Sequence, residues 1–563
     1  MNVTKITNIS NNPVLFPFHF CQEEDIQGRS GDYKGGHFMT ISKWMTAGTV
    51  LKMMAMQYPD KPAAGDKFRK MTFKEWNERS CRLANALAKM GVKKGDRFAI
   101  LAYNCVEWME IYAAAAKGGQ ITVPIMFRLA PPEMEYVVNH SECKTLFVAK
   151  DFVQTVNSFR NKLPTIPPEN FVYWGDDKAP EGYQHYESII AKASPAEPDV
   201  IVDADDAWNL MYTSGTTGKP KGVIRTHEGN LGQYLLSDLN TGVRPDDCVM
   251  LVMPMCHINS IFYSFAYTYA SARVFVYNMV SFDPLDLLKT IEKEKITFTS
   301  LVPTHYIMML SLPDEVKKKI DVSSIRQLLI SSAPARKDTK LAIMEYFKNS
   351  ELWEAYGSTE AGLVTLLRPE EQFKKLGSIG REIWGTDRIK ILDENGKEVP
   401  DGQVGELYSR TASIFKEYWK DPEKTKSVFQ GEWFSAGDMA YRDPDGYYVL
   451  MDRKANMIIS GGENIFPSEV ENLLGSHPAV KYVAVIGVPH EKWGEAVKAV
   501  VTLHQGKAAT EKELIEHCKG KIAGYKIPKS VDFIKDEEMP MTPQGKILHR
   551  ILREKYGKWS DIK

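Results

Sequence analysis

The sequence predicts an α/β protein with a large amino-terminal domain of mainly parallel sheets and a small α+β domain at its carboxyl end. Short β-branched runs alternate with longer helical stretches through most of the chain, which is typical of βαβ units. After about Ser378 the pattern changes to short strands with Gly/Asp turns, which predicts a small β-barrel-like part. A second compact unit begins near Arg453, so we expect domains at 1–452 and 453–563.

The predicted elements follow an extension at residues 1–40, a polar segment interrupted by glycines that we expect to lie on the body of the protein. Strands buried in parallel sheets occur as short apolar runs between helices. In the large domain we predict a helix at 106–117 and strands at 98–102, 120–124, 145–149, 208–212, 249–253, 273–277, 296–302, 388–392 and 405–410. In the small domain we predict helices at 467–474 and 511–521 and strands at 481–488 and 497–503.

The composition excludes several classes of function. The chain has 563 residues and a formal net charge of −1, whereas a general nucleic-acid binder needs an excess of Lys and Arg. The 7 cysteines occur without a CxxC pair, which argues against a disulfide scaffold or zinc ribbon and for a reducing compartment. The most apolar window, 258–280, is interrupted by Arg273, and the first twenty residues lack an unbroken apolar run. We therefore expect a soluble cytoplasmic protein without a transmembrane segment.

A loop rich in glycine and hydroxyl groups follows the strand predicted at 208–212. It reads Thr213-Ser214-Gly215-Thr216-Thr217-Gly218-Lys219-Pro220-Lys221-Gly222. Glycines let the main chain close around phosphate oxygens, while the hydroxyls and lysines add donors and positive charge. It is not a Walker A loop, because Pro220 follows Gly218-Lys219 where that motif needs Ser or Thr. The sequence therefore predicts a phosphate-binding loop, with a polar surface loop as the alternative.

This loop resembles the signature of the adenylate-forming superfamily, which includes acyl-CoA synthetases, luciferase-like enzymes and nonribosomal-peptide adenylation domains. Further segments resemble family motifs in the family's order: YGSTE at 356–360, GEWFSAGD at 431–438, YVLMDR at 448–453, SGGENIFPSEVE at 460–471 and PQGKI at 543–547. The resemblance covers nearly the whole chain. It implies an AMP-forming carboxylic acid:CoA ligase that uses ATP, Mg²⁺ and coenzyme A in a reversible reaction and whose small domain is mobile.

The resemblance also implies roles for the residues that match the motifs. The β- and γ-phosphates of ATP would contact Thr213, Ser214, Gly215, Thr216, Thr217 and Lys221. Thr359 would contact the α-phosphate and Glu360 would ligate Mg²⁺, a cation that suits one carboxylate plus substrate phosphates. Tyr356 would stack on adenine, with Gly357, Ser332 and Ala333 beside it. Asp438 would accept the ribose hydroxyls, supported by Arg453.

Lys546 is the predicted catalytic lysine, because a flexible ammonium can reach both the carboxylate and an α-phosphate oxygen. In the family the small domain then rotates and presents the face around Gly461 and Gly462 to the pantetheine arm of CoA. The chain departs from the family at its pivot, where Ala455 stands in place of the usual Asp or Lys. This difference puts in doubt any stabilisation of one domain orientation by a charged hinge.

The predicted acyl pocket lies beyond the strand at 249–253. His257 is expected to orient the acid or control water, as a catalytic group, with a structural histidine as the alternative. The remaining pocket residues implied by the resemblance are Asn259, Phe262, Ala333, Ala355, Gly357 and Leu363. No Asp stands at the head of this region to pair an α-ammonium, which argues against an amino-acid substrate.

The aromatic residues after Asn259 predict a compact apolar pocket, although aromatics at this spacing also occur as core residues. We expect a small cyclic or aromatic carboxylate, such as a benzoate- or cyclohexenecarboxylate-like acid, or a short-to-medium-chain acid. The alternatives are a carnitine/crotonobetaine-type or fatty-acid CoA ligase. From other classes of function, a luciferase-like oxygenase and a catalytically silent acyl-binding paralogue stay open.

Overall fold

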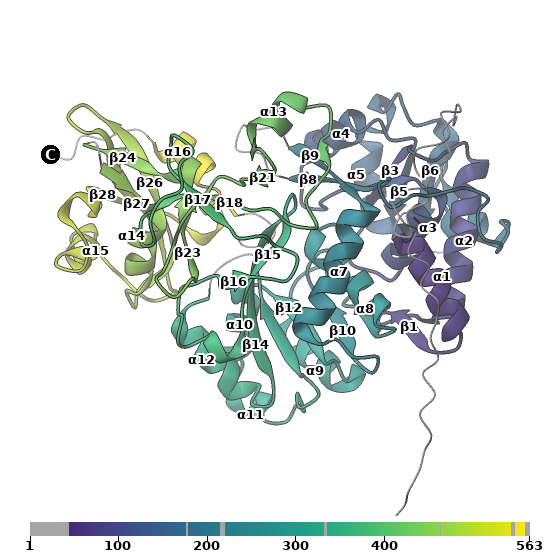
Figure 1. Ribbon diagram of the computed structural model, residues 1–563, viewed down its shortest axis with the longest axis horizontal. Helices are drawn as coiled ribbons and strands as arrows, with labels where there is room; N and C mark the ends of the chain where they lie inside the picture. Colours follow the sequence, from purple (N-terminus) through teal and green to yellow (C-terminus); the bar gives the residue numbers. More distant parts are fainter. Residues whose placement is uncertain are drawn as a thin grey trace, which may run out of the picture. The chain divides into compact units, whose positions relative to one another are not determined.

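The computed structural model describes residues 44–557, apart from 176–177, 214–219, 332–334, 462 and 542–546. The extension predicted at 1–40 lies outside these residues. Two large mixed sheets with helices packed against them make up most of the described chain, and smaller sheets follow toward the carboxyl end (Figure 1). The predicted α/β class is confirmed.

The helices are distributed along the whole described chain. Their bounds are α1 (Ala47–Gln57), α2 (Phe73–Lys89), α3 (Glu107–Gly118), α4 (Pro131–His140), α5 (Val153–Asn157), α6 (Tyr186–Ala191), α7 (His227–Thr241), α8 (Ile258–Tyr269), α9 (Pro284–Glu294), α10 (Pro303–Leu310), α11 (Asp314–Lys317), α12 (Lys337–Tyr346), α13 (Pro422–Ser427), α14 (Pro467–Gly475), α15 (Glu511–Cys518) and α16 (His549–Tyr556).

The largest sheet is mainly parallel. Its strands lie in the order β16 (Arg381–Glu382), β15 (Gly362–Leu367), β14 (Glu351–Ser358), β13 (Gln327–Ile330), β12 (Phe298–Leu301), β10 (Cys248–Leu251), β11 (Arg273–Val276), β1 (Pro62–Gly65) and β2 (Lys70–Thr72). Strands β10, β11, β12, β13 and β14 run parallel, whereas β15 and β16 are antiparallel additions. The carboxyl ends of the parallel strands therefore meet at one edge, where α/β sheets bind ligands.

Helices cover both faces of this sheet. Successive side chains of a strand point to opposite faces, so each strand can be followed into two separate hydrophobic clusters. Cys248 and Met250 of β10 pack in one hydrophobic cluster with residues of α9, α10 and α12. Val249 and Leu251 of the same strand pack in another cluster, together with Ile261 of α8. β10 is thus buried on both faces, which explains why its sequence is a continuous apolar run.

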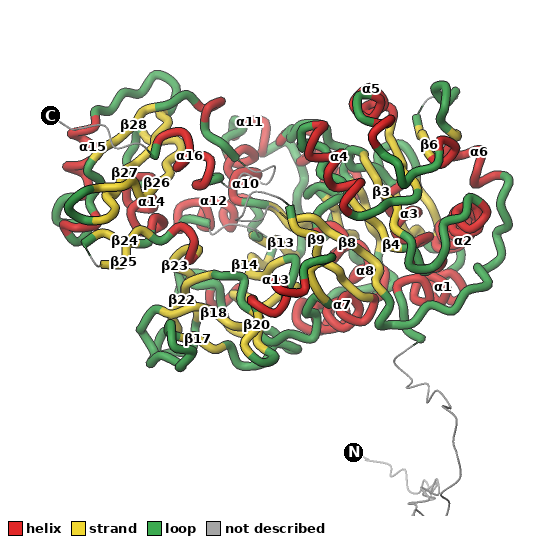
Figure 2. The backbone as a smooth tube through the Cα atoms, turned by 90° about the horizontal axis from the view of Figure 1, so that it is seen from above, coloured by secondary structure: helices red, strands yellow, loops and turns green. Residues whose placement is uncertain are grey.

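The second sheet carries the two strands that flank the predicted phosphate loop. Its strands lie in the order β19 (Glu417–Tyr418), β9 (Lys221–Thr226), β8 (Ala207–Thr213), β4 (Ile121–Pro124), β3 (Arg97–Leu101), β5 (Thr145–Ala149), β6 (Phe171–Trp174) and β7 (Gln184–His185). β8 and β9 form an antiparallel pair beside β4 and β3 (Figure 2). Thr213 lies opposite Lys221 in this pair, so the two ends of the loop are held together.

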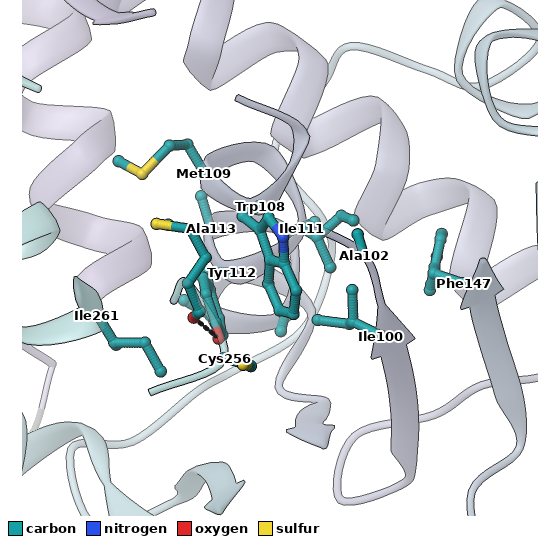
Figure 3. Packing of buried hydrophobic residues seen from close by; sticks show 14 of the residues in the cluster. Ile100, Ala102, Trp108, Met109, Ile111, Tyr112, Ala113, Phe147, Cys256 and Ile261 are labelled. Atoms are coloured by element: carbon teal, nitrogen blue, oxygen red, sulfur yellow. Dashed lines mark hydrogen bonds between the residues drawn. The ribbon is translucent and has the colours of Figure 1, made fainter. Parts of the chain in front are cut away.

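One cluster of buried apolar side chains joins the two sheets. Helix α3 is buried from Trp108 to Gly118, and its two charged residues in this stretch, Glu110 and Lys117, form ion pairs with Arg79 and Glu197. Figure 3 shows Trp108 beside Ile100 of β3, with Ile261 of α8 in the same core. The Tyr112 hydroxyl donates to the main-chain oxygen of Met255 at 2.8 Å, which satisfies this buried group and fixes the segment that leads into α8.

Two antiparallel units follow the large sheets. Residues between 390 and 453 form a four-stranded sheet in the order β17 (Lys390–Leu392), β18 (Gly405–Tyr408), β22 (Asp438–Arg442) and β23 (Tyr448–Arg453), and a hairpin of β20 (Phe429–Gln430) and β21 (Trp433–Phe434). In this sheet Asp438 lies opposite Arg453. These strands account for the short-strand pattern seen after Ser378.

The carboxyl-terminal sheet has the α+β composition predicted for this part of the chain. Its strands are β25 (Glu463–Ile465), β24 (Ile458–Ser460), β27 (Gly494–Leu503), β26 (Val480–His490) and β28 (Ser530–Phe533). Residues of α14 and α15 share a hydrophobic cluster with β26 and β27, and Leu552 of α16 packs in a second one.

The predicted elements agree with the observed ones to within a few residues. The strand predicted at 145–149 has the same bounds as β5. The helix predicted at 511–521 is shorter, because α15 ends at Cys518, Lys519 is extended and Gly520 has a φ of +71°. The apolar window at 258–280 forms α8 and β11, and none of the described helices has the length and apolar character needed to cross a bilayer.

Candidate active site

The hairpin of β14 and β15 carries the YGSTE segment at the carboxyl edge of the largest sheet. Tyr356 and Gly357 lie in β14, and Thr359 and Glu360 form the turn that leads back into β15. A Cβ atom added at Gly357 would lie 2.0 Å from the main-chain oxygen of Gly362. Only glycine fits there, so the close approach of the two strands explains this residue of the motif.

A cluster of three side chains joins β14 to the four-stranded sheet. The Tyr356 hydroxyl donates to Asp438 Oδ2 at 2.7 Å, and Arg453 Nε lies 2.6 Å from Asp438 Oδ1. Burial, together with Asp438, raises the pKa of Tyr356. Burial alone would lower the pKa of Arg453, but Asp438 and Tyr356 raise it above its ordinary value. Both carboxylate oxygens keep free lone pairs, so Asp438 can accept further hydrogen bonds.

A second polar cluster contains Glu360 and Lys221. The Tyr418 hydroxyl donates to Glu360 Oε1 at 2.8 Å, and Lys221 Nζ lies 5.7 Å from the centre of the Tyr418 ring. Burial and the neighbouring Lys424 lower the pKa of Lys221, while Glu360 acts in the opposite direction. Glu360 Oε2 has no hydrogen-bond partner among the described residues. One carboxylate oxygen is thus fixed and the other stays available.

Glu360 suits a hard cation that takes most of its ligands from a substrate. Nowhere in the described ranges are three or more His, Cys, Asp or Glu side chains grouped as a metal site. Mg²⁺ bound with nucleotides uses one or two carboxylates plus phosphate oxygens and water, and so does not require such a group. The available Oε2 of Glu360 meets this requirement.

The start of α8 lies beyond β10, where the sequence predicts the acyl pocket. His257 is the residue before the helix, and its Nδ1 accepts from the main-chain N–H of Asn259 at 3.3 Å. Burial lowers the pKa of His257 to about 4, so its imidazole is neutral at pH 7. This hydrogen bond gives His257 a structural role at the start of α8. Its role in orienting the acid or controlling water stays a prediction.

Asn259 connects α8 to the edge of the largest sheet. Its Nδ2 donates to Ser300 Oγ at 2.9 Å and to Ser331 Oγ at 3.3 Å. The hydroxyl oxygens of Ser300 and Ser331 lie 3.1 Å apart and share a hydrogen bond. Ser331 directly precedes Ser332 and Ala333, which the sequence assigns to the nucleotide site. The start of α8 is therefore tied to the segment that precedes these two residues.

Aromatic side chains from α7 and α8 surround Phe262. The Phe262 ring packs edge-on against Tyr234 and Tyr263, with centroid separations of 5.4 and 4.7 Å. Ala355 and Leu363 pack against the same hydrophobic cluster. These contacts show that the aromatic residues belong to the core, which is the alternative that the sequence left open, and their role in an acyl pocket stays a prediction.

Several predicted residues fall outside the described part of the chain. They are Ser214, Gly215, Thr216, Thr217, Ser332, Ala333, Gly462 and Lys546. Gly461 is described and lies between β24 and β25, where its N–H donates to the main-chain oxygen of Trp493 at 2.8 Å. At the predicted pivot, Arg553 donates to the main-chain oxygens of Ala455 and Asn456 at 2.7 and 2.6 Å. A charged side chain thus contacts the pivot although residue 455 is alanine.

Two residues that contact the Thr359–Glu360 turn are absent from the sequence prediction. Tyr418 holds Glu360, and Arg225 of β9 donates to the main-chain oxygen of Thr359 at 2.8 Å. The sequence signal for Arg225 is a charged residue that directly follows the apolar pair Val223 and Ile224 in the strand Lys221–Thr226. No comparable local signal marks Tyr418.

Comparisons with known proteins assign a family to this chain. A family model described as "AMP-binding enzyme" matches residues 51–419, and one described as "AMP-binding enzyme C-terminal domain" matches residues 469–546. The chain is 34% identical over 495 residues to the long-chain-fatty-acid–CoA ligase FadD13 of Mycobacterium tuberculosis, covering 87% of this chain and 93% of the relative. It is 35% identical over 491 residues to a feruloyl-CoA synthase of an Amycolatopsis species, covering 86% and 94%. The solved structure of the anthranilate CoA ligase AuaEII in complex with anthranoyl-AMP matches with a TM-score of 0.82 and 28% identity, covering 92% of this chain and 98% of that one.

Proposed function

The chain belongs to the AMP-binding enzyme family, as an AMP-forming acid–thiol ligase, and on this basis we propose that it joins a compact cyclic or aromatic carboxylic acid to CoA with Mg-ATP. The observation that carries the proposal is the pair of polar clusters around Glu360 and Asp438. One offers a carboxylate oxygen and a lysine, as a triphosphate with its cation requires. The other offers a buried carboxylate with free lone pairs, as ribose requires.

The reaction takes place in two steps. First an oxygen of the acid attacks the α-phosphorus of ATP, an acyl–O–P bond forms and pyrophosphate leaves. Then the CoA thiolate attacks the acyl carbonyl, a thioester forms and AMP leaves, while the thiol proton is released to solvent. Glu360 would hold Mg²⁺, which would neutralise part of the negative charge of the phosphates. Lys221 and Lys546 stabilise developing negative charge, and Asp438 and Tyr356 orient the nucleoside.

The aromatic wall supports the choice of a compact acid. Phe262 is 9% exposed and packs edge-on against Tyr234 and Tyr263, and in this proposal these rings form the end wall of the acyl pocket. Two of the similar proteins carry aryl substrates in their names, feruloyl and anthranilate. The similarity to a long-chain-fatty-acid–CoA ligase keeps fatty acids as the competing substrate class.

The substrate class is tested by measuring AMP and pyrophosphate release with CoA across benzoate, cyclohexenecarboxylate, hexanoate, palmitate and crotonobetaine. We expect the highest kcat/KM with benzoate or cyclohexenecarboxylate. Phe262→Ala should extend the accepted acids toward longer chains, because it removes a ring from the wall. If palmitate or crotonobetaine is the best substrate of the wild type, the substrate proposal is wrong. If no acid supports AMP release, the silent-paralogue alternative gains support.

Tyr418→Phe tests the proposed cation site. The variant keeps the ring but removes the hydroxyl that holds Glu360 Oε1 at 2.8 Å. Because partners of metal ligands typically contribute about 10–100-fold to metal affinity, we expect a roughly tenfold higher Mg²⁺ concentration for half-maximal activity. The matched control is Tyr447→Phe, which removes a similar hydroxyl–carboxylate bond, to Glu371 at 2.7 Å, and should leave the Mg²⁺ requirement unchanged. Equal Mg²⁺ requirements in the wild type and Tyr418→Phe would contradict the assignment.

A further inference from the structure

Arg225 is a buried arginine whose charge no contacting carboxylate neutralises within the described residues. It is 1% exposed and is the next-to-last residue of β9. Its Nη1 donates to the main-chain oxygen of Thr359 at 2.8 Å, and its Nε donates to Asn230 Oδ1 at 3.0 Å. Burial lowers its pKa to about 10, so the guanidinium remains charged at pH 7. Removing a charge from water is costly, so such a residue in a core needs a physical reason.

A buried polar network holds the guanidinium from the second sheet. Asn230 Nδ2 donates to the main-chain oxygen of Thr226 at 2.9 Å and lies 3.4 Å from Asn209 Oδ1. Asn209 Nδ2 donates to Thr122 Oγ1 of β4 at 2.8 Å. Asn209, Thr122 and Asn230 are at most 1% exposed. The network therefore extends from the centre of this sheet to Arg225, and it orients the side chain.

The other end of Arg225 holds the turn that carries Glu360. Besides the bond to Thr359, Nη1 lies 3.5 Å from the main-chain oxygen of Glu360. That oxygen also accepts from the N–H of Phe415 at 2.7 Å. Tyr234 and Glu360 oppose the effect of burial on the pKa of Arg225, and of these two groups only the Glu360 carboxylate is charged at pH 7, because burial raises the pKa of Tyr234. The guanidinium thus contacts the main chain of the Thr359–Glu360 turn, and the Glu360 carboxylate lies near enough to oppose the effect of burial on the pKa of Arg225.

We propose that Arg225 is a positioning residue for the triphosphate end of the nucleotide site, where it fixes the Thr359–Glu360 turn and adds a permanent positive charge beside it. The inference rests on the proposed use of Mg-ATP. It goes beyond the predicted phosphate contacts, because Arg225 acts from the interior through the main chain of two residues. A merely structural cross-link between the sheets is the competing explanation.

The test compares Arg225→Met, which removes the charge and the donors at similar length, with Arg225→Lys, which keeps the charge. Lysine lacks the planar fork that reaches Asn230 and Thr359 together, so it should restore only part of the function. Binding of Mg-ATP and of AMP is measured by titration calorimetry, without any acid. We expect Mg-ATP affinity to fall about tenfold or more in Arg225→Met and less in Arg225→Lys. AMP affinity should change by less than about threefold, because AMP does not need the cation at Glu360.

Arg326→Met is the matched control for loss of a structural arginine. Arg326 precedes β13 at the opposite, amino end of the parallel strands and donates to Asp247 Oδ1 at 3.2 Å. This variant should lower the melting temperature without changing the ratio of Mg-ATP to AMP affinity. Mg-ATP affinity within twofold of wild type, in whichever Arg225 variant folds, overturns the proposal, and so does an equal loss of Mg-ATP and AMP affinity. Absence of Mg-ATP binding in the wild type would instead refute the proposed function itself.

Discussion

Asp438→Ala should lower kcat/KM for ATP by about 10²–10³-fold. Asp438 is 7% exposed and its carboxylate is held by Tyr356 and Arg453, so its position is fixed before a nucleotide binds. A hydrogen bond to a charged group contributes about 1.5–3 kcal/mol, and two ribose hydroxyls would each form one. The measurement is steady-state kinetics with ATP and with 2′-deoxy-ATP. The wild type should prefer ATP strongly, and the variant should lose most of this preference.

Asp401→Ala is the control for Asp438→Ala. Asp401 pairs with Arg442 of the same four-stranded sheet at 2.6 Å, but its side chain is 42% exposed. Its removal should leave the preference for ATP over 2′-deoxy-ATP intact. Thermal unfolding separates loss of stability from loss of recognition, since Asp438→Ala also leaves Arg453 without its partner. A variant that keeps the wild-type preference between the two nucleotides would show that Asp438 does not contact ribose.

Lys546→Ala should slow acyl-adenylate formation by about 10²–10³-fold, the effect typical of removing one donor that stabilises a transition state. The second step does not use this lysine in the proposed mechanism. Thioester formation from preformed acyl-AMP and CoA should therefore stay within about twofold of wild type. The two steps are measured separately, the first by pyrophosphate exchange and the second by AMP release.

Lys555→Ala supplies the comparison for Lys546. Lys555 belongs to α16, its Nζ lies 3.4 Å from Glu538 Oε1, and its side chain is 52% exposed. It has no predicted role in the reaction, so its loss removes only a cation from the same part of the chain. Both steps should proceed normally in this variant. Equal slowing of the two steps in Lys546→Ala would indicate a general defect and would rule out a role specific to adenylation.

The fold class could be predicted because buried strands leave a local pattern. β5 is buried at all five positions, and its sequence is a short apolar run between helical stretches. In contrast, the sequence around a strand does not indicate which of the two large sheets the strand belongs to. β10 ends at Leu251 and its neighbour in the sheet, β12, begins only at Phe298, with β11 and α9 between them along the chain. Pairing of this kind is decided by packing of whole layers.

The predicted site residues came from motifs, and the missed ones depend on contacts between distant segments. Tyr418 reaches Glu360 across 58 positions, and Arg225 reaches Thr359 across 134. A tyrosine in a two-residue strand has nothing unusual in its neighbours along the chain. Arg225 could have been noticed as a charge next to the apolar pair Val223 and Ile224, but its partner could not have been deduced. Such contacts are found only when the strands are placed in space.

The packing of Phe262 against Tyr234 has an evolutionary consequence. These rings belong to α7 and α8, whereas Tyr356, Asp438 and Arg453 are presented by β14, β22 and β23. Substitutions of these rings can therefore accumulate without disturbing the strands that hold the Asp438 cluster, as long as the contacts of Gln233 with Leu363 and of Asn259 with Ser331 are kept. With the acid placed as proposed, a lineage that inherits this arrangement can diversify in the acids it accepts while purifying selection preserves its chemistry. Relatives that act on feruloyl and long-chain fatty acyl groups are the kind of diversity that such a separation permits.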